Sequence, residues 1–243
     1  MEVTEKEIMK RLINYTTGTD YEPLQVDLEI CSPIYLTTPY INLDSIVLSL
    51  CTREALDDLF YILPSDKFID TSVVDLPFKL TDDVPHCSVG QFIGLNRLKK
   101  DTVYKRFTDK ETYHLTRKQQ KGRIHTDRGH YKDFMIDLPM IICRGLRFYC
   151  NADKKDLTHL LSHLRGIGKK VSIGSGRIKS VTIKPISEDY SFYKNGEIMR
   201  PIPTKLKVPI CEGMTYRMEA YKPPYWNKDN VAMCVVPKSQ IKT

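Results

Sequence analysis

The sequence predicts an α+β fold, because segments with the period of a strand alternate with segments that have the period of a helix. Residues 24–30 (LQVDLEI) alternate strictly between apolar and polar side chains, which is typical of a half-buried strand. Leu157, Leu160, Leu161 and Leu164 recur at helical spacing and give one apolar face. With 243 residues, 41% of them apolar, the chain is able to bury a sizeable core.

The remaining elements follow from the same patterns. Helices are expected over residues 5–14, 43–50 (continuing through 55–63 up to Pro64) and 156–164, and strands over 24–30, 73–80, 87–95, 145–150 and 178–184. Asn42 or Asp44 is a candidate N-cap for the second helix, and Asn151 or Asp153 for the third. The order of these elements predicts a ferredoxin-like core that carries a large insertion. The proline-bearing residues 185–243 are expected to form an irregular C-terminal extension.

The positive charge of the chain is concentrated in one central segment. The chain has 37 basic and 30 acidic residues, a net charge of +7. Residues 97–147 hold 14 basic and 6 acidic residues (net +8), so the rest, with 23 and 24, has a net charge of −1. We interpret residues 97–135 as a basic insertion, a long hairpin arm that offers a surface to phosphates, although a solvated lysine-rich loop would have the same composition. Its candidate contacts are Arg117, Lys118, Lys121, Arg123, Arg128 and Lys132.

The seven cysteines predict buried thiols in a reducing compartment. Their number is odd, no CxxC pair occurs, and several lie in apolar stretches. A structural zinc site is not expected. The charged residues 1–6 do not resemble a signal peptide, and no run of residues is long and apolar enough for a membrane span. We therefore expect a cytoplasmic protein without a membrane partner.

The most informative motif is the segment 165–177 (RGIGKKVSIGSGR), here called the glycine loop. Glycine lets a ligand approach the backbone closely, and backbone N–H groups together with cations suit a phosphodiester chain. The GxxxxGK[ST] order of a nucleotide P-loop is absent, and the loop closes a helix instead of opening one after a strand. A helix-to-strand connection with a glycine C-cap is the alternative, but one glycine would be enough for it. The candidate RNA contacts are Arg165, Gly166, Gly168, Lys169, Lys170, Ser172, Gly174, Ser175, Gly176 and Arg177.

A helix, a loop of the form GxGKxxSxGxGR and a strand resemble the RAMP superfamily of CRISPR-associated RNA-binding proteins. Three further blocks, residues 36–50, 199–203 (MRPIP) and 223–226 (PPYW), resemble the handle-binding, Cas-five-type subunit of type IV effector complexes. The resemblance spans about residues 24–237, and these four short blocks carry it.

The resemblance implies a single RAMP-type domain over residues 1–243, with an RRM-like ferredoxin core and a thumb-like insertion. It implies a guide RNA partner, held by its 5′ handle, together with CRISPR backbone subunits and a large subunit. The subunit would cap the backbone filament, and its basic insertion would be positioned to contact target DNA beside the protospacer. No cofactor and no enzymatic activity are expected.

The histidines leave a second function open. Related nucleases of the superfamily cleave repeat RNA by general acid–base catalysis, often with a histidine. His125, beside Lys121 and Arg123, is the candidate for such a site, and His114 and His130 lie in the same insertion. We favour the interpretation that these side chains stack on bases or contact phosphate without reaction.

Two other pairs of residues have both a functional and a structural interpretation. His159 and His163 have a spacing that could bind a metal, but no third ligand is evident, so no metal is expected. Tyr225 and Trp226 could stack on a base, or could pack the C-terminal extension against the core.

Overall fold

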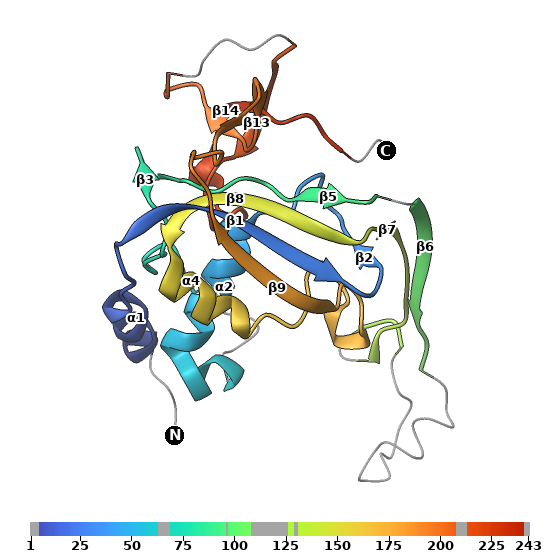
Figure 1. Ribbon diagram of the computed structural model, residues 1–243. Coiled ribbons are helices and arrows are strands. Elements are labelled where there is room, and N and C mark those ends of the chain that lie inside the picture. The colour runs from blue at the N-terminus through green and yellow to red at the C-terminus, as the bar shows by residue number, and fades with distance from the viewer. Residues whose placement is uncertain are drawn as a thin grey trace.

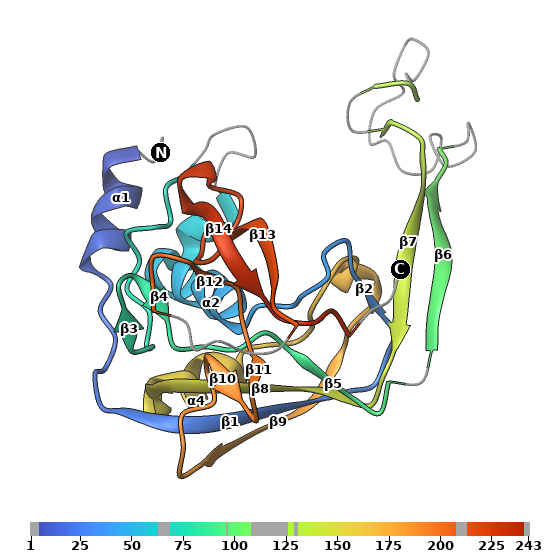
Figure 2. The ribbon, with the colours of Figure 1, turned by 90° about the horizontal axis from the view of Figure 1, so that it is seen from above.

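The computed structural model describes residues 5–62, 69–95, 97–107, 126–128, 131–207 and 213–240. An antiparallel four-stranded sheet and three helices form its main body, and a second, smaller sheet lies beyond one edge of the first (Figure 1). A two-stranded hairpin, β6 with β7, projects at the end of the main body away from α1 (Figure 2). The α+β class predicted from the sequence is confirmed.

The main sheet is built around β1 (Tyr21–Ile30). β8 (Gly145–Asp153) and β9 (Ile178–Pro185) pair with its two sides, and β5 (Gln91–Ile93) pairs with β8, giving the order β5-β8-β1-β9. The half-buried strand predicted from the alternating sequence is confirmed. The apolar residues of β1 are all buried in the main core: Leu24, Val26, Leu28 and Ile30.

Two helices pack against the buried face of this sheet. α2 (Leu43–Leu56) is the first of these helices, and it continues directly into a 3-10 turn, η1 (Asp57–Ile62). α4 (Lys154–Ser162) follows β8 directly, and its Leu157, Leu160 and Leu161 are buried as predicted. α1 (Glu5–Asn14) packs against α2.

The two predicted helix caps have different outcomes. The side chain of Asp153 accepts a hydrogen bond from the backbone N–H of Asp156 at 3.1 Å, so this cap of α4 is confirmed. Asn42 occupies the N-cap position of α2, but its side chain makes no capping hydrogen bond. Asp44 is a buried residue of the first helical turn.

The strands expected over 73–80 and 87–95 are largely absent. Residues 73–79 form turns and bridges before a minimal hairpin of β3 (Leu80–Thr81) and β4 (Val84–Pro85). In the second segment only β5 is a strand, because successive N–H groups bind different parts of the chain. Ser88 N–H donates to Tyr149 O, Val89 N–H to Met199 O, and Gly90 N–H to Ile41 O. A continuous ladder with one partner strand therefore cannot form.

The hairpin consists of β6 (Arg97–Lys105) and β7 (Phe134–Ile142), which pair along their whole length. β7 also pairs with β2 (Ile34–Tyr35), so these strands form a sheet of order β2-β7-β6. The strands lie at the base of the basic insertion, where a hairpin is predicted. The centre of the insertion, residues 108–125, lies outside the described residues.

The C-terminal extension is more regular than the sequence predicts. β12 (Ile202–Pro203), β14 (Val231–Val236) and β13 (Thr215–Ala220) form a three-stranded sheet, and β10 (Tyr193–Lys194) pairs with β11 (Glu197–Ile198). A short 3-10 turn, η4 (Lys228–Asn230), precedes β14. The expectation of an irregular tail was wrong because β14 is a nearly continuous apolar run, whose Cys234, Val235 and Val236 are buried. Such a run forms a strand when another layer covers it.

The cysteines are mostly buried thiols. Cys51, Cys87, Cys150 and Cys234 are buried, and burial raises the pKa of Cys51 to about 12. Cys31 is exposed, contrary to the expectation that the cysteines are buried. It follows Ile30, the last residue of β1, and lies outside the core. None of the cysteines in the described ranges forms a disulfide. No helix in these ranges is long and apolar enough to cross a membrane.

Candidate nucleic-acid interface

The glycine loop folds back on itself between α4 and β9. The N–H of Ile167 donates to Gly176 O at 3.0 Å, and the N–H of Ile178 donates to Arg165 O at 3.1 Å, so the two ends of the loop are paired. A 3-10 turn, η3 (Val171–Ile173), forms its tip. The predicted loop between a helix and a strand is therefore a compact structure held by its own backbone.

Two glycines are required by close packing within this loop. Gly168 has φ +83°, and a Cβ there would lie 2.7 Å from Tyr35 O. Gly176 has φ +59°, and a Cβ would lie 1.9 Å from Ile167 O. Gly174 also has a positive φ, of +93°, but open space surrounds the position of its missing Cβ. It is therefore the glycine whose surroundings leave room for a ligand.

β2 and the residues just before it hold the glycine loop in place. Gly176 N–H donates to Pro33 O at 2.8 Å, and Lys169 N–H donates to Tyr35 O at 2.8 Å. The Ser32 hydroxyl donates to Gly174 O and accepts from Arg177 N–H, each at 2.8 Å. These bonds fix the loop, and they also use many of the backbone N–H groups that the sequence suggested as ligand donors.

The remaining backbone donors lie together at the tip of the loop. Within the described ranges, the N–H groups of Gly168, Lys170, Val171 and Ser172 have no hydrogen-bond partner. Lys170 has a left-handed backbone conformation and the residues after it form η3. Successive N–H groups in such a turn are able to bind an anion.

The side chains of the glycine loop divide into an outer and an inner set. Arg165, Lys169, Ser172 and Arg177 are exposed, whereas Ser175 and Gly176 are buried. Lys170 is half-buried, with its ammonium 4.6 Å from the centre of the Phe134 ring on β7. The loop therefore presents cations to solvent and at the same time contacts β7, at the end of the paired strands where Lys105 and Phe134 meet.

A cavity of about 480 Å³ lies between the glycine loop and the start of α2. We call it the tyrosine cavity, because Tyr35, Tyr40 and Tyr225 line it. Its other walls come from the connection before α2, from α2 itself and from the first half of the glycine loop: Leu36, Thr37, Thr38, Ile41, Asn42, Ser45, Ile46, Ser49, Leu50, Leu164, Gly166, Ile167, Gly168 and Lys169.

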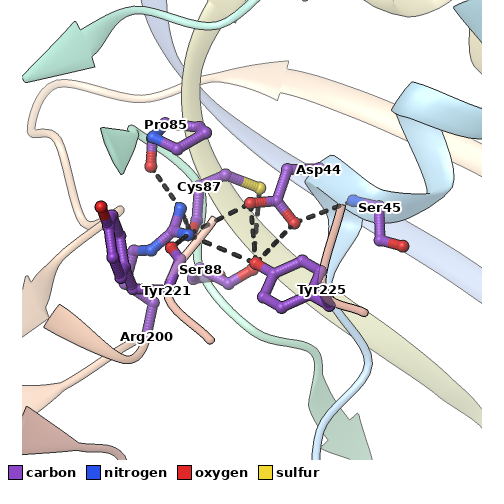
Figure 3. A network of polar contacts seen from close by, with 8 residues as sticks. All are labelled: Asp44, Ser45, Pro85, Cys87, Ser88, Arg200, Tyr221 and Tyr225. Atoms are coloured by element: carbon purple, nitrogen blue, oxygen red, sulfur yellow. Dashed lines mark hydrogen bonds and ion pairs between the residues drawn. The ribbon is translucent and has the colours of Figure 1, made fainter. Parts of the chain in front are cut away.

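A buried ionic network fixes one wall of the tyrosine cavity (Figure 3). The guanidinium of Arg200, whose side chain is 1% exposed, donates to Asp44 Oδ2 at 3.1 Å and to the carbonyl oxygens of Pro85, Cys87 and Tyr221. The Tyr225 hydroxyl donates to the same carboxylate at 2.9 Å. Burial, together with the negative charge of Asp44, raises the pKa of Tyr225 well above its usual value.

This network was not predicted from the sequence. Arg200 belongs to the MRPIP block and Tyr225 to the PPYW block, and both bind a carboxylate in the first turn of α2. An arginine inside an otherwise apolar, proline-rich segment was the available signal, since arginine is almost never buried unless it is paired.

The structure assigns different surroundings to the two aromatic residues of the PPYW block. Tyr225 packs the C-terminal extension against the core through its hydroxyl, while its ring lines the tyrosine cavity. The Trp226 side chain is 55% exposed and does not line this cavity. Stacking on a base therefore stays a prediction for both residues.

The basic insertion is only partly described. Arg128 and Lys132 are exposed, as are Arg97, Lys99 and Lys100 on β6. Lys100 pairs with Asp137 across the hairpin at 2.7 Å. The other candidate contacts and histidines of the insertion, Arg117, Lys118, Lys121, Arg123, His114, His125 and His130, lie outside the described residues.

The two helical histidines lie beside a second cavity, of about 440 Å³, between α2 and α4. The rings of His159 and His163 meet edge to face at 5.2 Å, and His159 Nε2 lies 3.3 Å from Glu54 Oε2. Arg53 and Arg165 also line this cavity. Three metal-ligating side chains do not converge anywhere in the part of the chain that the structure describes.

Comparison with known proteins identifies the family. Residues 86–237 match the family described as CRISPR type IV associated protein Csf3. The match covers well over half of the 243 residues, including the hairpin, the glycine loop and most of the C-terminal extension, so the chain belongs to this family. The predicted link to type IV CRISPR systems is confirmed at this level.

More distant comparisons add little. No curated protein matches the chain. Among solved structures, it is similar to a chain in the cryo-EM structure of the type III-B Cmr-beta bound to cognate target RNA. The identity is 11% and the TM-score 0.36, with 68% of this chain and 61% of that chain covered. This chain thus spans less than two thirds of the length of that one, and the likeness does not define a shared fold.

Proposed function

We propose that this chain is an RNA-binding, non-enzymatic subunit of a type IV CRISPR guide-RNA surveillance complex. In this proposal the glycine loop holds the 5′ handle of the crRNA, and the subunit caps the filament of backbone subunits next to a large subunit. The observation that carries the proposal is the tip of the glycine loop. There, the unpaired N–H groups of Lys170, Val171 and Ser172 follow the exposed Lys169, while exposed Arg165 and Arg177 flank the loop at its paired ends. Membership of the Csf3 family supports the assignment to a type IV system.

The proposal includes a ferredoxin-like, RAMP-type core within a single domain. The chain order β1-α2-β5-β8-α4-β9, with the sheet order β5-β8-β1-β9 and both helices on one face, supports this inference. The basic insertion leaves this core between β5 and β8, as a thumb would. The glycine loop follows the second helix, at the end of the sheet from which the hairpin projects.

The basic insertion is the part of the subunit that we assign to target DNA. In guide-RNA complexes base pairing reads the sequence, whereas the protein holds backbone and handle. A projecting hairpin with exposed Arg97, Lys99 and Lys100 at its base is suited to contact a duplex through its phosphates. Its contact with the glycine loop, through Lys170 and Phe134, would join the two nucleic-acid surfaces.

The test of RNA binding is a pair of matched double variants. Lys169→Ala with Lys170→Ala removes two cations of the glycine loop, and Lys154→Ala with Lys155→Ala removes two cations at the far end of α4. Affinity for the repeat-derived 5′ segment of the guide RNA is measured by fluorescence anisotropy at several salt concentrations. We expect the loop variant to flatten the slope of log K against log salt by about 1–2, and the control variant to leave it unchanged. Equal slopes for wild type and loop variant would overturn the proposal.

The alternative function, a guide-processing endoribonuclease, has its own test. Purified protein is incubated with repeat RNA in EDTA, and the products are resolved by denaturing electrophoresis. We expect no cleavage at a defined position. Defined cleavage that disappears in a His125→Ala variant would replace the binding-only proposal with the nuclease.

A further inference from the structure

We propose that the tyrosine cavity receives a single unstacked nucleobase of the RNA whose phosphates contact the glycine loop. The inference rests on the proposed RNA binding and adds to it a base-binding subsite with named walls. The loop and the cavity are continuous, because Gly166, Gly168 and Lys169 belong to both. A strand held by its phosphates at the loop can therefore turn one base toward α2.

The aromatic walls of the cavity are held in place before any ligand arrives. Each of the three tyrosines uses its hydroxyl in a hydrogen bond to a residue that does not line the cavity: Tyr35 donates to Asp101 on β6, Tyr40 to Pro237 O at 2.9 Å, and Tyr225 to Asp44 at 2.9 Å. The rings are left as fixed flat surfaces. Base–aromatic stacking needs such surfaces and tolerates any base, since every base has a π-face.

Polar side chains that have no hydrogen-bond partner among the described residues also line the cavity. Asn42 occupies the N-cap position of α2, yet its amide neither caps the helix nor has another partner among the described residues. The exposed hydroxyls of Ser45 and Ser49 follow it on the cavity side of α2. An amide offers a donor and an acceptor side by side, which is the pattern that base edges present.

The charge of the cavity favours a nucleotide over a cationic ligand. Among its lining residues Lys169 is the single charged one, and no carboxylate faces it. The neighbouring cavity between α2 and α4, in contrast, is lined by Glu54 and Asp57 as well as by arginines. A volume of about 480 Å³ lies within the range of small-ligand sites, and a base with its ribose fits it.

The Arg200 network gives the C-terminal extension a part in this subsite. By binding Asp44 in the first turn of α2, Arg200 and Tyr225 fix the wall formed by the PPYW block against the wall formed by α2 (Figure 3). The two blocks of the extension thereby set the width of the cavity. The role of Arg200 is positioning, because its side chain is buried and does not line the cavity.

The experiment compares RNA with and without bases. Fluorescein-labelled single-stranded oligomers of about 12 nucleotides (rA, rC, rU, and an abasic ribose-phosphate chain of the same length) are titrated with the full chain. Ser49→Leu fills the cavity from the exposed side of α2, and Ser162→Leu is the matched control on the exposed side of α4. Asn42→Ala removes the amide alone. Thermal unfolding checks that all variants are folded.

We expect the wild type to bind at least one base-bearing oligomer about ten-fold more tightly than the abasic chain, as one stacked base provides. Ser49→Leu should abolish this difference without changing abasic binding or its salt slope, and Ser162→Leu should retain it. Asn42→Ala should reduce the preference among the three bases. If the abasic chain binds as tightly as the others, or if Ser49→Leu keeps the full difference, the cavity is not a base site, while RNA binding by the loop stands. If no oligomer binds, the inference falls together with the proposed function.

Discussion

Arg200 is the residue on which the attachment of the C-terminal extension depends most. Its guanidinium is buried and binds Asp44 together with three backbone carbonyls. Arg200→Ala would leave the Asp44 carboxylate buried without its counter-charge, and breaking a buried ion pair in this way costs about 3–5 kcal/mol of unfolding free energy. Urea unfolding, followed by circular dichroism, measures this loss.

An exposed ion pair provides the control for Arg200. Arg217 pairs with Glu219 at the surface, where its side chain is 48% exposed. Arg217→Ala should lower the unfolding free energy by less than about 1 kcal/mol. Similar losses in the two variants would contradict the assignment of Arg200 as a buried structural cation.

Two glycines of the loop allow the effect of close packing and the effect of ligand access to be tested separately. Gly176→Ala places a Cβ against Ile167 O, so the loop must open, whereas Gly174→Ala adds only the backbone strain of a positive φ. We expect Gly174→Ala to cost about 1–2 kcal/mol of unfolding free energy, and Gly176→Ala to cost more and to weaken RNA binding. Thermal unfolding and RNA titration of both variants check this, and a more stable Gly176→Ala than Gly174→Ala would refute it.

At the scale of elements, the hairpin β6–β7 contributes little to the core. Most side chains of β6 are exposed, and the cross-strand pair Tyr104 and Met135 is 70% and 77% exposed. β7 buries Leu138 and Ile141, but the end of the strand pair near Tyr104 and Met135 adds little buried apolar area to the folded state. We therefore expect this end of the hairpin to serve the nucleic-acid binding proposed above.

Removing the part of the basic insertion that lies beyond the paired strands tests whether the insertion contacts nucleic acid. Residues 106–133 are replaced by a short Asn-Gly turn that joins the paired ends Lys105 and Phe134. This removes eight basic and four acidic residues. We expect the melting temperature to stay within about 2–4 °C of the wild type, and the salt slope of binding to duplex DNA to fall by several units. A large loss of stability would assign residues 106–133 a structural role, and an unchanged slope would contradict their contact with duplex DNA.

At the scale of the whole molecule, we expect the C-terminal extension and the core to fold as one unit. Tyr221, Cys234 and Val236 of the extension pack with Val84 of β4 in a small apolar cluster beside the main core. Asp189 of the extension binds His86 at 2.8 Å and Asn151 at 3.1 Å. Burial opposes the charge of Asp189, but the hydrogen bonds from His86, Ser191 and Asn151 outweigh it and hold the pKa of this carboxyl well below its usual value.

A chain ending at residue 185 should therefore fail to fold cooperatively. It retains all four strands of the main sheet but leaves Asp44 without Arg200 and exposes the apolar residues that the extension covers. We expect it to be aggregated or to lack a cooperative thermal transition, in contrast to the shortened-hairpin variant. A sharp transition close to that of the full chain would show that the extension is a separate unit.

The sequence determined the features that depend on near neighbours. The alternation in β1, the leucine face of α4 and the Asp153 cap all involve residues a few positions apart, so their period and chemistry were visible along the chain. The cations and glycines of the loop could be recognised for the same reason. The RAMP-type resemblance came from short motifs of this kind, and the family match agrees with its type IV assignment.

Only the tertiary structure decided the contacts between distant residues. The strand expected over 87–95 was interrupted because its N–H groups bind three different segments, and the irregular tail became a sheet because other layers covered β14. Asp44 and Arg200 are 156 positions apart, and the tyrosine cavity joins three stretches of chain. Local periodicity reports which face of an element is buried, but not which partner covers it. The cavity beside the glycine loop is formed entirely by such partners, and for this reason it could not be found in the sequence.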